Sequence, residues 1–493
     1  MGVHQKQIEL WVEPVELGRR IPEDHILRKL ARAVDLSFVR EEVAACYGRK
    51  GHISLDPVII VKMMMMLFLD DVRSERELMR IIPLRIDYLW YLGYGLEDEV
   101  PNHSVLSKAR KRRGTGVFES LFKETIRKCL EAGLIDGEKV HVDSSDIRAN
   151  ASKNSVVDIA FRETLGKLEE AEEGEEAGSK QGQARSRDGE VNRTKRSATD
   201  PEATLKGYGR GDSVPSYKNH RVVDDKAGVV SAMMTTASIV NEAHKLEELV
   251  EQHELNTGTE VRVAVTDCQY GTSENFIALA QRGIRTHMGD LRSRQSNHRL
   301  EGIFPTEEFH YERESDTYLC PAGNRLRYRH WNGRRNYAEY KASVTDCTHC
   351  PLRPQCTRAK AGRSVNRRPE QDILDKAREQ SASAAGKTDR KRRQHFQERN
   401  FADAANLHGF KRARWRGLAR QFVQDYLIAA LQNLRILLRG TPKDTWASAL
   451  ALTNGLLGAF SLFSSLFASI LLLPTAIPCT ATPNSKKSNP YAL

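Results

Sequence analysis

The chain has 493 residues, of which 40% are hydrophobic, 29% charged and 7% aromatic. This is the composition of a globular protein of roughly two to four domains, and it excludes a collagen, a disulfide-bonded miniprotein and a wholly disordered chain. The formal net charge of +11 favours an anionic partner, either nucleic acid or a membrane surface. The opening MGVHQKQIEL has no apolar run and predicts no signal peptide.

Residues 1–135 are expected to form a helical domain. Asp56 and Pro57 have the pattern of an N-cap followed by proline at the first helical position, and an apolar run continues from them. The consecutive methionines Met63 to Met66 suit either an adaptable binding face or a buried core helix, and we favour the core. A later helix carries the basic run KARKRR (108–113), which is typical of a solvated helix face as much as of DNA binding.

An α/β domain is expected to begin after Gly137. The predicted elements are strands at 139–147, 260–267 and 284–288, a hairpin within 217–240, and helices at about 241–255 and 273–282. This mixed order predicts one α/β sheet with helices on its faces. Residues 162–200 are charged and poor in aromatic side chains, which predicts a disordered or loosely helical insertion.

Three acidic residues stand out by their positions. Asp143 and Asp267 come at the ends of two predicted strands, where carboxylates are natural ligands for hard cations. Glu398 lies in the most basic part of the chain, since residues 357–439 contain 20 Lys/Arg and 8 Asp/Glu. Each acid alone is more often a cap or surface carboxylate, so only their combination predicts a metal site. Asp146 is the alternative to Asp143.

Six segments resemble, in the same order, motifs of the bacterial insertion-sequence transposases, which have an InsH-type N-terminal domain and an RNase H-like DDE catalytic domain. The segments are GRKGHISLDPVIIVKMMMMLFL with VPNHSVLSKARKR, HVDSSDIRANAS, SATDPEA, YKNHRVVDDKAGVVSAMMTTAS, VTDCQYGTSEN and QERNFADAANLHGFKRARWRGLARQFVQDYLIAALQNLRIL. The resemblance covers most of residues 35–440. It implies an α/β fold with an RNase H-like mixed sheet and flanking helices, preceded by an all-α domain and interrupted by a Cys-containing insertion.

The resemblance also implies an activity, namely metal-dependent cleavage of transposon ends and strand transfer into target DNA. It maps the catalytic, metal-binding triad onto Asp143, Asp267 and Glu398, with Mg²⁺ or Mn²⁺ as the ion. Two such ions can stabilise both the attacking and the leaving oxygen of an in-line displacement at phosphorus. Ala405 stands where the family commonly has a basic residue, seven positions after the Glu. A catalytically decayed transposase that only binds DNA is therefore the alternative.

Partners and boundaries follow from the same resemblance. We expect double-stranded DNA (transposon ends and target) as the partner, a homo-oligomer on that DNA, and a bacterial cytoplasmic location at the nucleoid. The basic residues expected to contact phosphates are Lys108, Arg110, Lys411, Arg412, Arg414 and Arg416. The expected segments are a DNA-binding domain at 1–135, the first catalytic part at 136–289 with a charged insertion at 155–215, the Cys-containing insertion at 290–386, the Glu-bearing part at 387–440, and an apolar tail at 441–493.

Four of the eight cysteines crowd one segment: Cys320, Cys347, Cys350 and Cys356. One tight C-x-x-C pair with two further thiols suits a tetrahedral structural zinc. Free thiols in a loop-rich insertion are the alternative.

The apolar stretch 455–473 has the length and hydropathy of a membrane-spanning helix. We expect it not to be an anchor, because a span would restrict the search of a DNA enzyme for its ends. A helix docked on the catalytic domain or in an oligomer interface, a membrane tether of a regulator, and a fused tail without function are the alternatives.

Overall fold

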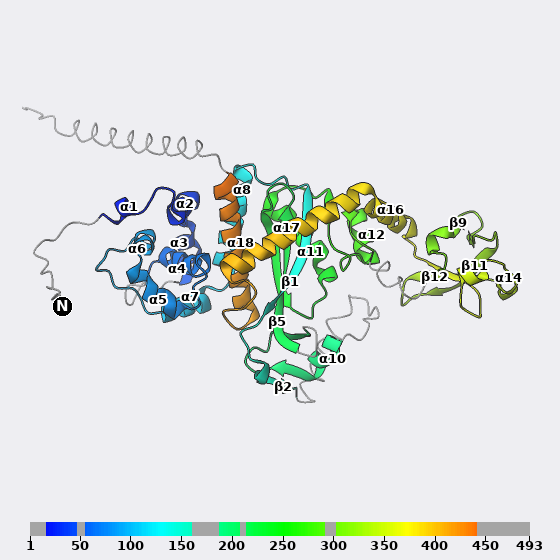
Figure 1. The fold of residues 1–493 in the computed structure, drawn as a ribbon, viewed down its shortest axis with the longest axis horizontal. Coiled ribbons are helices and arrows are strands. Elements are labelled where there is room, and N and C mark those ends of the chain that lie inside the picture. The colour runs from blue at the N-terminus through cyan, green and yellow to red at the C-terminus, as the bar shows by residue number, and fades with distance from the viewer. Residues whose placement is uncertain (1–15, 47–54, 160–186, 208–212, 291–301, 441–493) are drawn as a thin grey trace, which may run out of the picture. The chain divides into compact units, whose positions relative to one another are not determined.

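The structure is a computed structural model in which residues 16–46, 55–159, 187–207, 213–290 and 302–440 are described (Figure 1). The chain divides into two compact units, Met1–Leu438 and Arg439–Leu493. The apolar stretch 455–473 lies outside the described residues. Among the helices of the described part, none combines the length and apolar character needed to cross a membrane.

The N-terminal part of the chain is helical, as predicted. Its helices are α1 (Leu17–Arg20), α2 (Ile26–Ala33), α3 (Phe38–Glu42), α4 (Pro57–Leu69), α5 (Glu75–Ile81), α6 (Ile86–Leu92), α7 (Ser104–Arg113) and α8 (Gly116–Glu131). Asp56 caps α4 by accepting a hydrogen bond from the Val58 backbone N–H at 2.9 Å. Met63 to Met66 are at most 2% exposed, so the core interpretation of the methionine run is confirmed.

The central sheet has the strand order β6–β5–β1–β7–β8, with the short strand β4 also paired to β5. The bounds are β1 (Lys139–Arg148), β4 (Thr204–Gly207), β5 (Ser213–Asp224), β6 (Val230–Ala237), β7 (Val263–Val265) and β8 (Arg285–His287). β6 is antiparallel to β5 and β5 to β1, whereas β7 and β8 continue the sheet parallel to β1. This is the strand arrangement of an RNase H-like fold, so the expected fold class is confirmed. β7 is shorter than the predicted strand because only three of its residues pair with β1 and β8.

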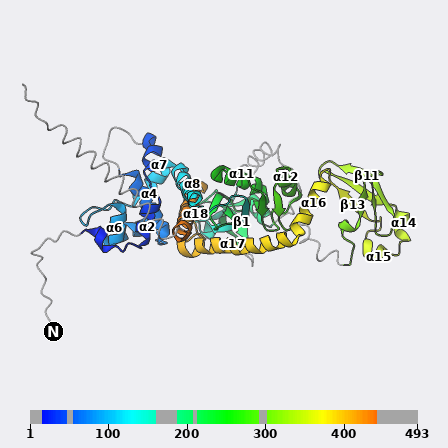
Figure 2. The same cartoon turned by 90° about the horizontal axis from the view of Figure 1, so that it is seen from above.

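Helices cover both faces of this sheet (Figure 2). They are α11 (Leu246–Thr257), α12 (Ser273–Gln281), α16 (Gln371–Ala382), α17 (Ala384–His408) and α18 (Leu418–Gly440). Val140 and Val142 of β1 face an apolar core shared with α11, α12 and α16. The alternate residues of β1 point to the opposite face, because side chains alternate along a strand. There α17 crosses the sheet diagonally in Figure 1, and Figure 2 shows it on the side opposite α11 and α12.

A second sheet occupies the insertion, which sequence patterns had indicated only as polar and Cys-bearing. It is antiparallel with the order β13–β12–β11–β10–β9. The bounds are β9 (His310–Glu312), β10 (Thr317–Leu319), β11 (Arg325–Asn332), β12 (Tyr337–Ala342) and β13 (Ser364–Arg367), with the short helices α14 (Val344–Thr348) and α15 (Arg353–Cys356). Its apolar core is small and includes Leu326, Tyr340, Val365 and Cys356.

The charged segment 162–200 is ordered at its end. α10 (Arg187–Thr194) leads into β3 (Lys195–Ser197), which pairs with β2 (Val156–Asp158). The helix α10 agrees with the loosely helical alternative, whereas the prediction is wrong for Lys195–Ser197, because pairing with β2 makes them a strand. Residues 160–186 lie outside the described part.

Candidate active site

Asp143 and Asp267 come from adjacent parallel strands. β1 and β7 pair in register, with His141 opposite Val265. Asp143 and Asp267 each follow those residues by two positions, so both lie at the same level of the sheet. Burial raises the pKa of Asp143, and the negative charge of Asp267 adds to the rise, whereas Arg393 and the Ser144 backbone N–H oppose it. The two carboxylates are thus close enough to repel each other.

Helix α17 carries the groups that contact this edge of β1. Arg393 donates a hydrogen bond to Asp143 Oδ2 in a mostly buried ion pair. One turn later, Gln397 Nε2 donates to the His141 carbonyl at 2.7 Å, and Phe396 stacks on the His141 ring with centroids 5.4 Å apart. These contacts hold α17 over the strand that bears the first aspartate.

Glu398 lies on this same helix but on another side of it. The residues of α17 that face the sheet are spaced three or four apart, as in Arg393, Gln397 and Asn400. Glu398 is exposed, and its carboxylate accepts a hydrogen bond from Gln394 Nε2 at 2.9 Å. Within the described ranges, no group of three or more His, Cys, Asp or Glu side chains is placed to hold one metal ion. The structure brings Asp143 and Asp267 together and leaves Glu398 facing solvent.

Asp146, the alternative first acid, is three residues along β1 and so projects to the other face of the strand. Burial raises its pKa, which Lys206, Lys218 and Lys411 lower. Its surroundings are therefore cationic side chains rather than Asp267, which favours Asp143 as the partner of Asp267.

Sequence reasoning missed a fully buried arginine beside Asp143. Arg221 lies directly opposite Asp143 in the β1–β5 register. Its Nη1 donates to Asn400 Oδ1 of α17 at 2.8 Å and to Gln432 Oε1 of α18 at 2.7 Å. Burial lowers the pKa of Arg221 to about 10, against the opposing charge of Asp425. Arg221 therefore ties both covering helices to the strand next to the candidate site. The HRVVDD pattern gave no signal of this, because a single arginine in a strand does not show which side chains it will contact.

Two of the six arginines and lysines predicted to bind DNA are engaged inside the protein instead. Arg414 pairs with Asp71 at 2.6 Å, donates to the Leu67 carbonyl at 3.0 Å and lies 4.3 Å from the Phe68 ring centroid. Arg110 is buried, pairs with Glu75 and lies 4.0 Å from the Trp415 ring centroid. Neither guanidinium is available for a phosphate, so this part of the expectation is corrected.

The other four, Lys108, Lys411, Arg412 and Arg416, are exposed. Lys411 donates a hydrogen bond to Ser145 Oγ, two residues beyond Asp143 on the same face of β1. Arg416 Nε donates to the Asn150 carbonyl at 3.1 Å. Lys411 and Arg416 therefore lie along the end of β1.

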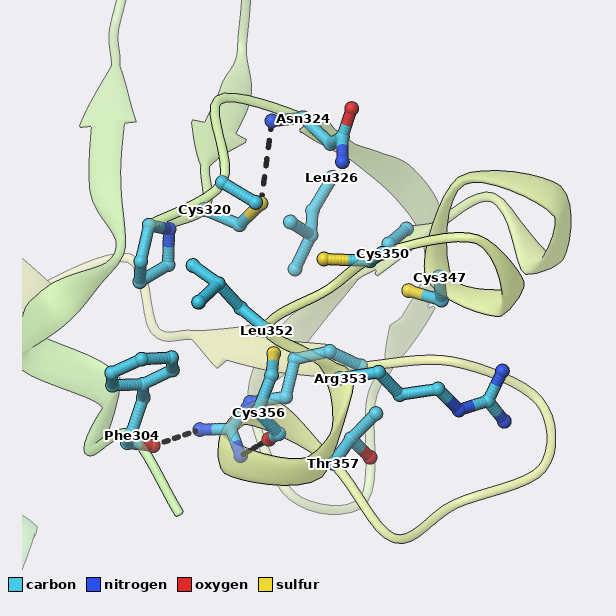
Figure 3. A pocket seen from close by; sticks show the side chains of 14 residues that line it. Phe304, Cys320, Asn324, Leu326, Cys347, Cys350, Leu352, Arg353, Cys356 and Thr357 are labelled. Carbon is cyan, nitrogen blue, oxygen red and sulfur yellow. Dashed lines mark hydrogen bonds between the residues drawn. The ribbon is translucent and has the colours of Figure 1, made fainter. Parts of the chain in front are cut away.

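The four clustered cysteines converge on one small pocket of the insertion (Figure 3). The pocket holds about 20 Å³ and is also lined by Phe304, Leu326 and Leu352. The Asn324 backbone N–H donates to Cys320 Sγ at 3.3 Å. Burial raises the pKa of the Cys356 thiol, Arg363 lowers it, and the thiols of Cys320, Cys347 and Cys350 raise it further. All four sulfurs therefore share one environment, although no three of them are spaced as metal ligands.

An RNase H-like sheet with two aspartates on adjacent parallel strands is the framework of a phosphoryl-transfer domain of the DDE type. Two families match the chain, "Transposase domain (DUF772)" over residues 15–112 and "Transposase DDE domain" over residues 319–438. Both matches support the function of a DDE-type DNA transposase, as the motifs predicted, and they are consistent with the insertion-sequence class. Enzymes with this domain depend on a divalent metal ion.

One solved structure to which the chain is similar is the piggyBac transposase synaptic complex with hairpin DNA. The alignment has 10% identity and a TM-score of 0.35, and it covers 92% of this chain and 84% of the other. This likeness is too low to support an assignment, so the RNase H-like fold rests on the strand order of the central sheet. No curated protein matches the chain.

Proposed function

We propose that this transposase cleaves the ends of its own element and joins them to target DNA, with Asp143, Asp267 and Glu398 as the metal-binding carboxylates. The position of Asp143 and Asp267 at the same level of two adjacent parallel strands is the observation that carries the proposal, and the repulsion between them agrees with it. A divalent cation would replace that repulsion with attraction, and Mg²⁺ prefers carboxylate oxygens. Two bound ions would stabilise the attacking and leaving oxygens at phosphorus.

The remaining residues hold and orient the groups that react. Arg393 fixes the Asp143 carboxylate, and Gln397 and Phe396 fix the helix that carries Arg393. Lys411 and Arg416 are placed to orient the phosphate backbone at the end of β1. Glu398 is proposed from its motif position, five residues beyond Arg393 on α17. Because Glu398 is exposed, its entry into the site requires an adjustment of α17 when DNA binds.

Substitution of the acids tests this assignment. The substrate is a duplex that carries the sequences flanking the coding segment, assayed for cleavage with Mg²⁺ or Mn²⁺. Asp143→Asn, Asp267→Asn and Glu398→Gln should each abolish cleavage and leave DNA affinity within about twofold. Asp403→Asn, on the same helix as Glu398, is the control and should cleave normally.

If Glu398→Gln cleaved at the rate of the control, Glu398 would not belong to the triad, and only Asp143 and Asp267 would remain as candidate ligands. Binding without cleavage by the unmodified chain would instead identify the catalytically decayed alternative.

We further propose that the four-cysteine pocket holds a structural Zn²⁺. Four thiols in one otherwise apolar pocket fit Zn²⁺, and the backbone N–H directed at Cys320 Sγ would neutralise part of a thiolate charge. A small core gains most from such a site. Elemental analysis should find one zinc per chain, which Cys347→Ser/Cys350→Ser loses and Cys46→Ser keeps. Purified chain without zinc would contradict the proposal.

The assembly is also proposed to be a homo-oligomer on DNA, because an insertion sequence has two ends to be joined at one target. Sedimentation of the chain with end-bearing duplexes should give two or more chains per complex, and a single chain on each duplex would contradict this.

A further inference from the structure

The insertion sheet has one face over its core and one that is strongly cationic. In β11 only Leu326 is buried, and the residues around it are exposed. Between residues 325 and 341 the sequence has six Lys/Arg and one acid. We call the outward surface of these two strands and their turn the β11–β12 face; its cations are Arg325, Arg327, Arg329, Arg334, Arg335 and Lys341.

Two of these cations stand directly opposite each other. Arg327 and Lys341 are paired in the β11–β12 register, and Thr317 and Ser364 continue the same row on the flanking strands. Like charges at opposed positions of an antiparallel pair are destabilising. Neither side chain has an ion-pair partner among the residues that the structure describes. A sheet that keeps such a pair gains nothing in stability from it.

The acids of the module offset only part of the charge. Arg325 pairs with Glu312 at 3.2 Å, while Arg329 and His330 share Glu339 at 3.6 and 3.2 Å. Arg334 and Arg335 occupy the turn, and within the described part neither forms an ion pair. Four cations of the face therefore remain unneutralised.

Two exposed aromatic side chains lie on the opposite, core side of the sheet, because Tyr328 pairs with the buried Tyr340 and Trp331 with the buried Ala338. Tyr328 is 50% exposed and Trp331 is 45% exposed, both unusual for large apolar groups. A pocket of about 690 Å³ lies on the face, and its polar lining consists of Arg325, Arg327, Arg329, Lys341, Ser343 and a single acid, Asp346. Four cations and a hydroxyl group against one acid match the sugar–phosphate backbone of DNA.

We propose that the β11–β12 face binds the phosphate backbone of duplex DNA, as a contact additional to those of the N-terminal helices and the residues around Lys411. The inference rests on the transposase function and adds a surface to it. Because phosphates carry no base information, this face should strengthen binding to transposon ends and unrelated duplexes alike.

The test is the salt dependence of DNA binding by the full chain, measured by fluorescence anisotropy on end-bearing and unrelated duplexes. Arg327→Glu/Lys341→Glu should weaken binding to both duplexes at least tenfold at low salt and reduce the slope of log K against log salt by about two. Lys360→Glu/Lys376→Glu makes the same charge change at exposed positions outside the face and should change affinity by less than threefold.

Arg327→Glu alone separates binding from folding. It places a carboxylate opposite Lys341, so the thermal midpoint should stay equal or rise while DNA affinity falls. A parallel fall of midpoint and affinity would overturn the proposal, and so would an unchanged salt slope in the double variant. Loss of binding to phosphatidylserine vesicles with DNA affinity unchanged would mean a membrane contact and would also overturn it. If the unmodified chain cleaves DNA and the double variant binds like it, the transposase function stands and this inference alone fails.

Discussion

Two short segments of this chain look alike in sequence but differ in which of their side chains are engaged inside the protein. KRARWR (411–416) joins α17 to α18, and RLRYRHW (325–331) forms β11. In the first, Arg414 is taken up by Asp71 and backbone carbonyls, and Trp415 packs on Phe68 with ring centroids 5.6 Å apart. In the second, the cations and aromatics remain at the surface. The difference lies in what each cation contacts, since Arg414 is held by an internal carboxylate and carbonyl, whereas Lys411, Arg412 and Arg416 are exposed like the cations of β11.

The largest effect is expected at Arg221, a fully buried cation. Arg221→Met leaves the oxygens of Asn219, Asn400 and Gln432 without their donor and Asp425 without its counter-charge. We expect a loss of about 3–5 kcal/mol in the free energy of unfolding. Urea denaturation measures it, with Arg327→Met as the exposed control that should change stability by less than about 0.5 kcal/mol. Equal losses in both variants would show that burial does not separate the two groups of cations.

Asp425, the acid that faces Arg221, should make the free energy of unfolding depend on pH. Burial raises the pKa of Asp425 to about 6, against hydrogen bonds from Thr235, Gln421 and Asn219. A carboxyl whose pKa rises on folding favours the folded state when protonated, so stability should fall as pH rises from about 4 to 6. The fall is about 3 kcal/mol for a shift of this size. Unfolding curves across that range should show it, and Asp425→Asn should remove the slope. A flat profile in the unmodified chain would contradict the raised pKa.

Arg414 should behave as an internal residue despite its basic neighbours. Arg414→Ala removes the ion pair with Asp71 and the hydrogen bond to the Leu67 carbonyl, so stability should fall by about 2 kcal/mol. The salt slope of DNA binding should not change, because Arg414 contacts no phosphate. A slope reduced by about one, with stability intact, would return this residue to the DNA surface.

The smallest effect on folding is expected for the exposed cations of segment 411–416, in contrast to the internal Arg414. Arg412→Ala/Arg416→Ala changes two exposed cations, so the free energy of unfolding should move by less than about 0.5 kcal/mol. DNA affinity should fall several-fold, and the salt slope should decrease by about two. Anisotropy titrations and urea melts on the same preparation measure both, and destabilisation without a change of slope would contradict the assignment.

What the sequence predicts well is what depends on local pattern. Asp56 and Pro57 begin a helix through a cap, and the turn at 225–228 closes a hairpin. Asp267 follows the end of β7 as predicted, whereas Asp143 lies in the middle of β1 and not at its end, because β1 continues to Arg148. The insertion sheet escaped prediction because its longest strand exposes most of its residues and so lacks the alternation of a half-buried strand.

Partners that are distant along the chain leave no local signal either. Arg414 finds Asp71 across 343 residues, which composition cannot reveal. The face that α17 turns to the sheet is polar, with Asp389, Arg393, Gln397 and Asn400. Without an apolar stripe to mark the buried side, the exposure of Glu398 could not be read from its motif.

The position of α17 and α18 after the insertion has a consequence for biosynthesis. The β8 strand leaves the ribosome about 150 residues before the end of α18, which is on the order of ten seconds of translation. During that interval the nascent sheet exposes Arg221 and Asp143 without the helices that cover them, and Cys129 waits for the Asn433 carbonyl, 304 residues away. The catalytic domain can therefore assemble only after α18 has been synthesised. A gene copy interrupted after β8 would yield a substrate for chaperones and proteases, and such copies should not accumulate as competing fragments in the cell.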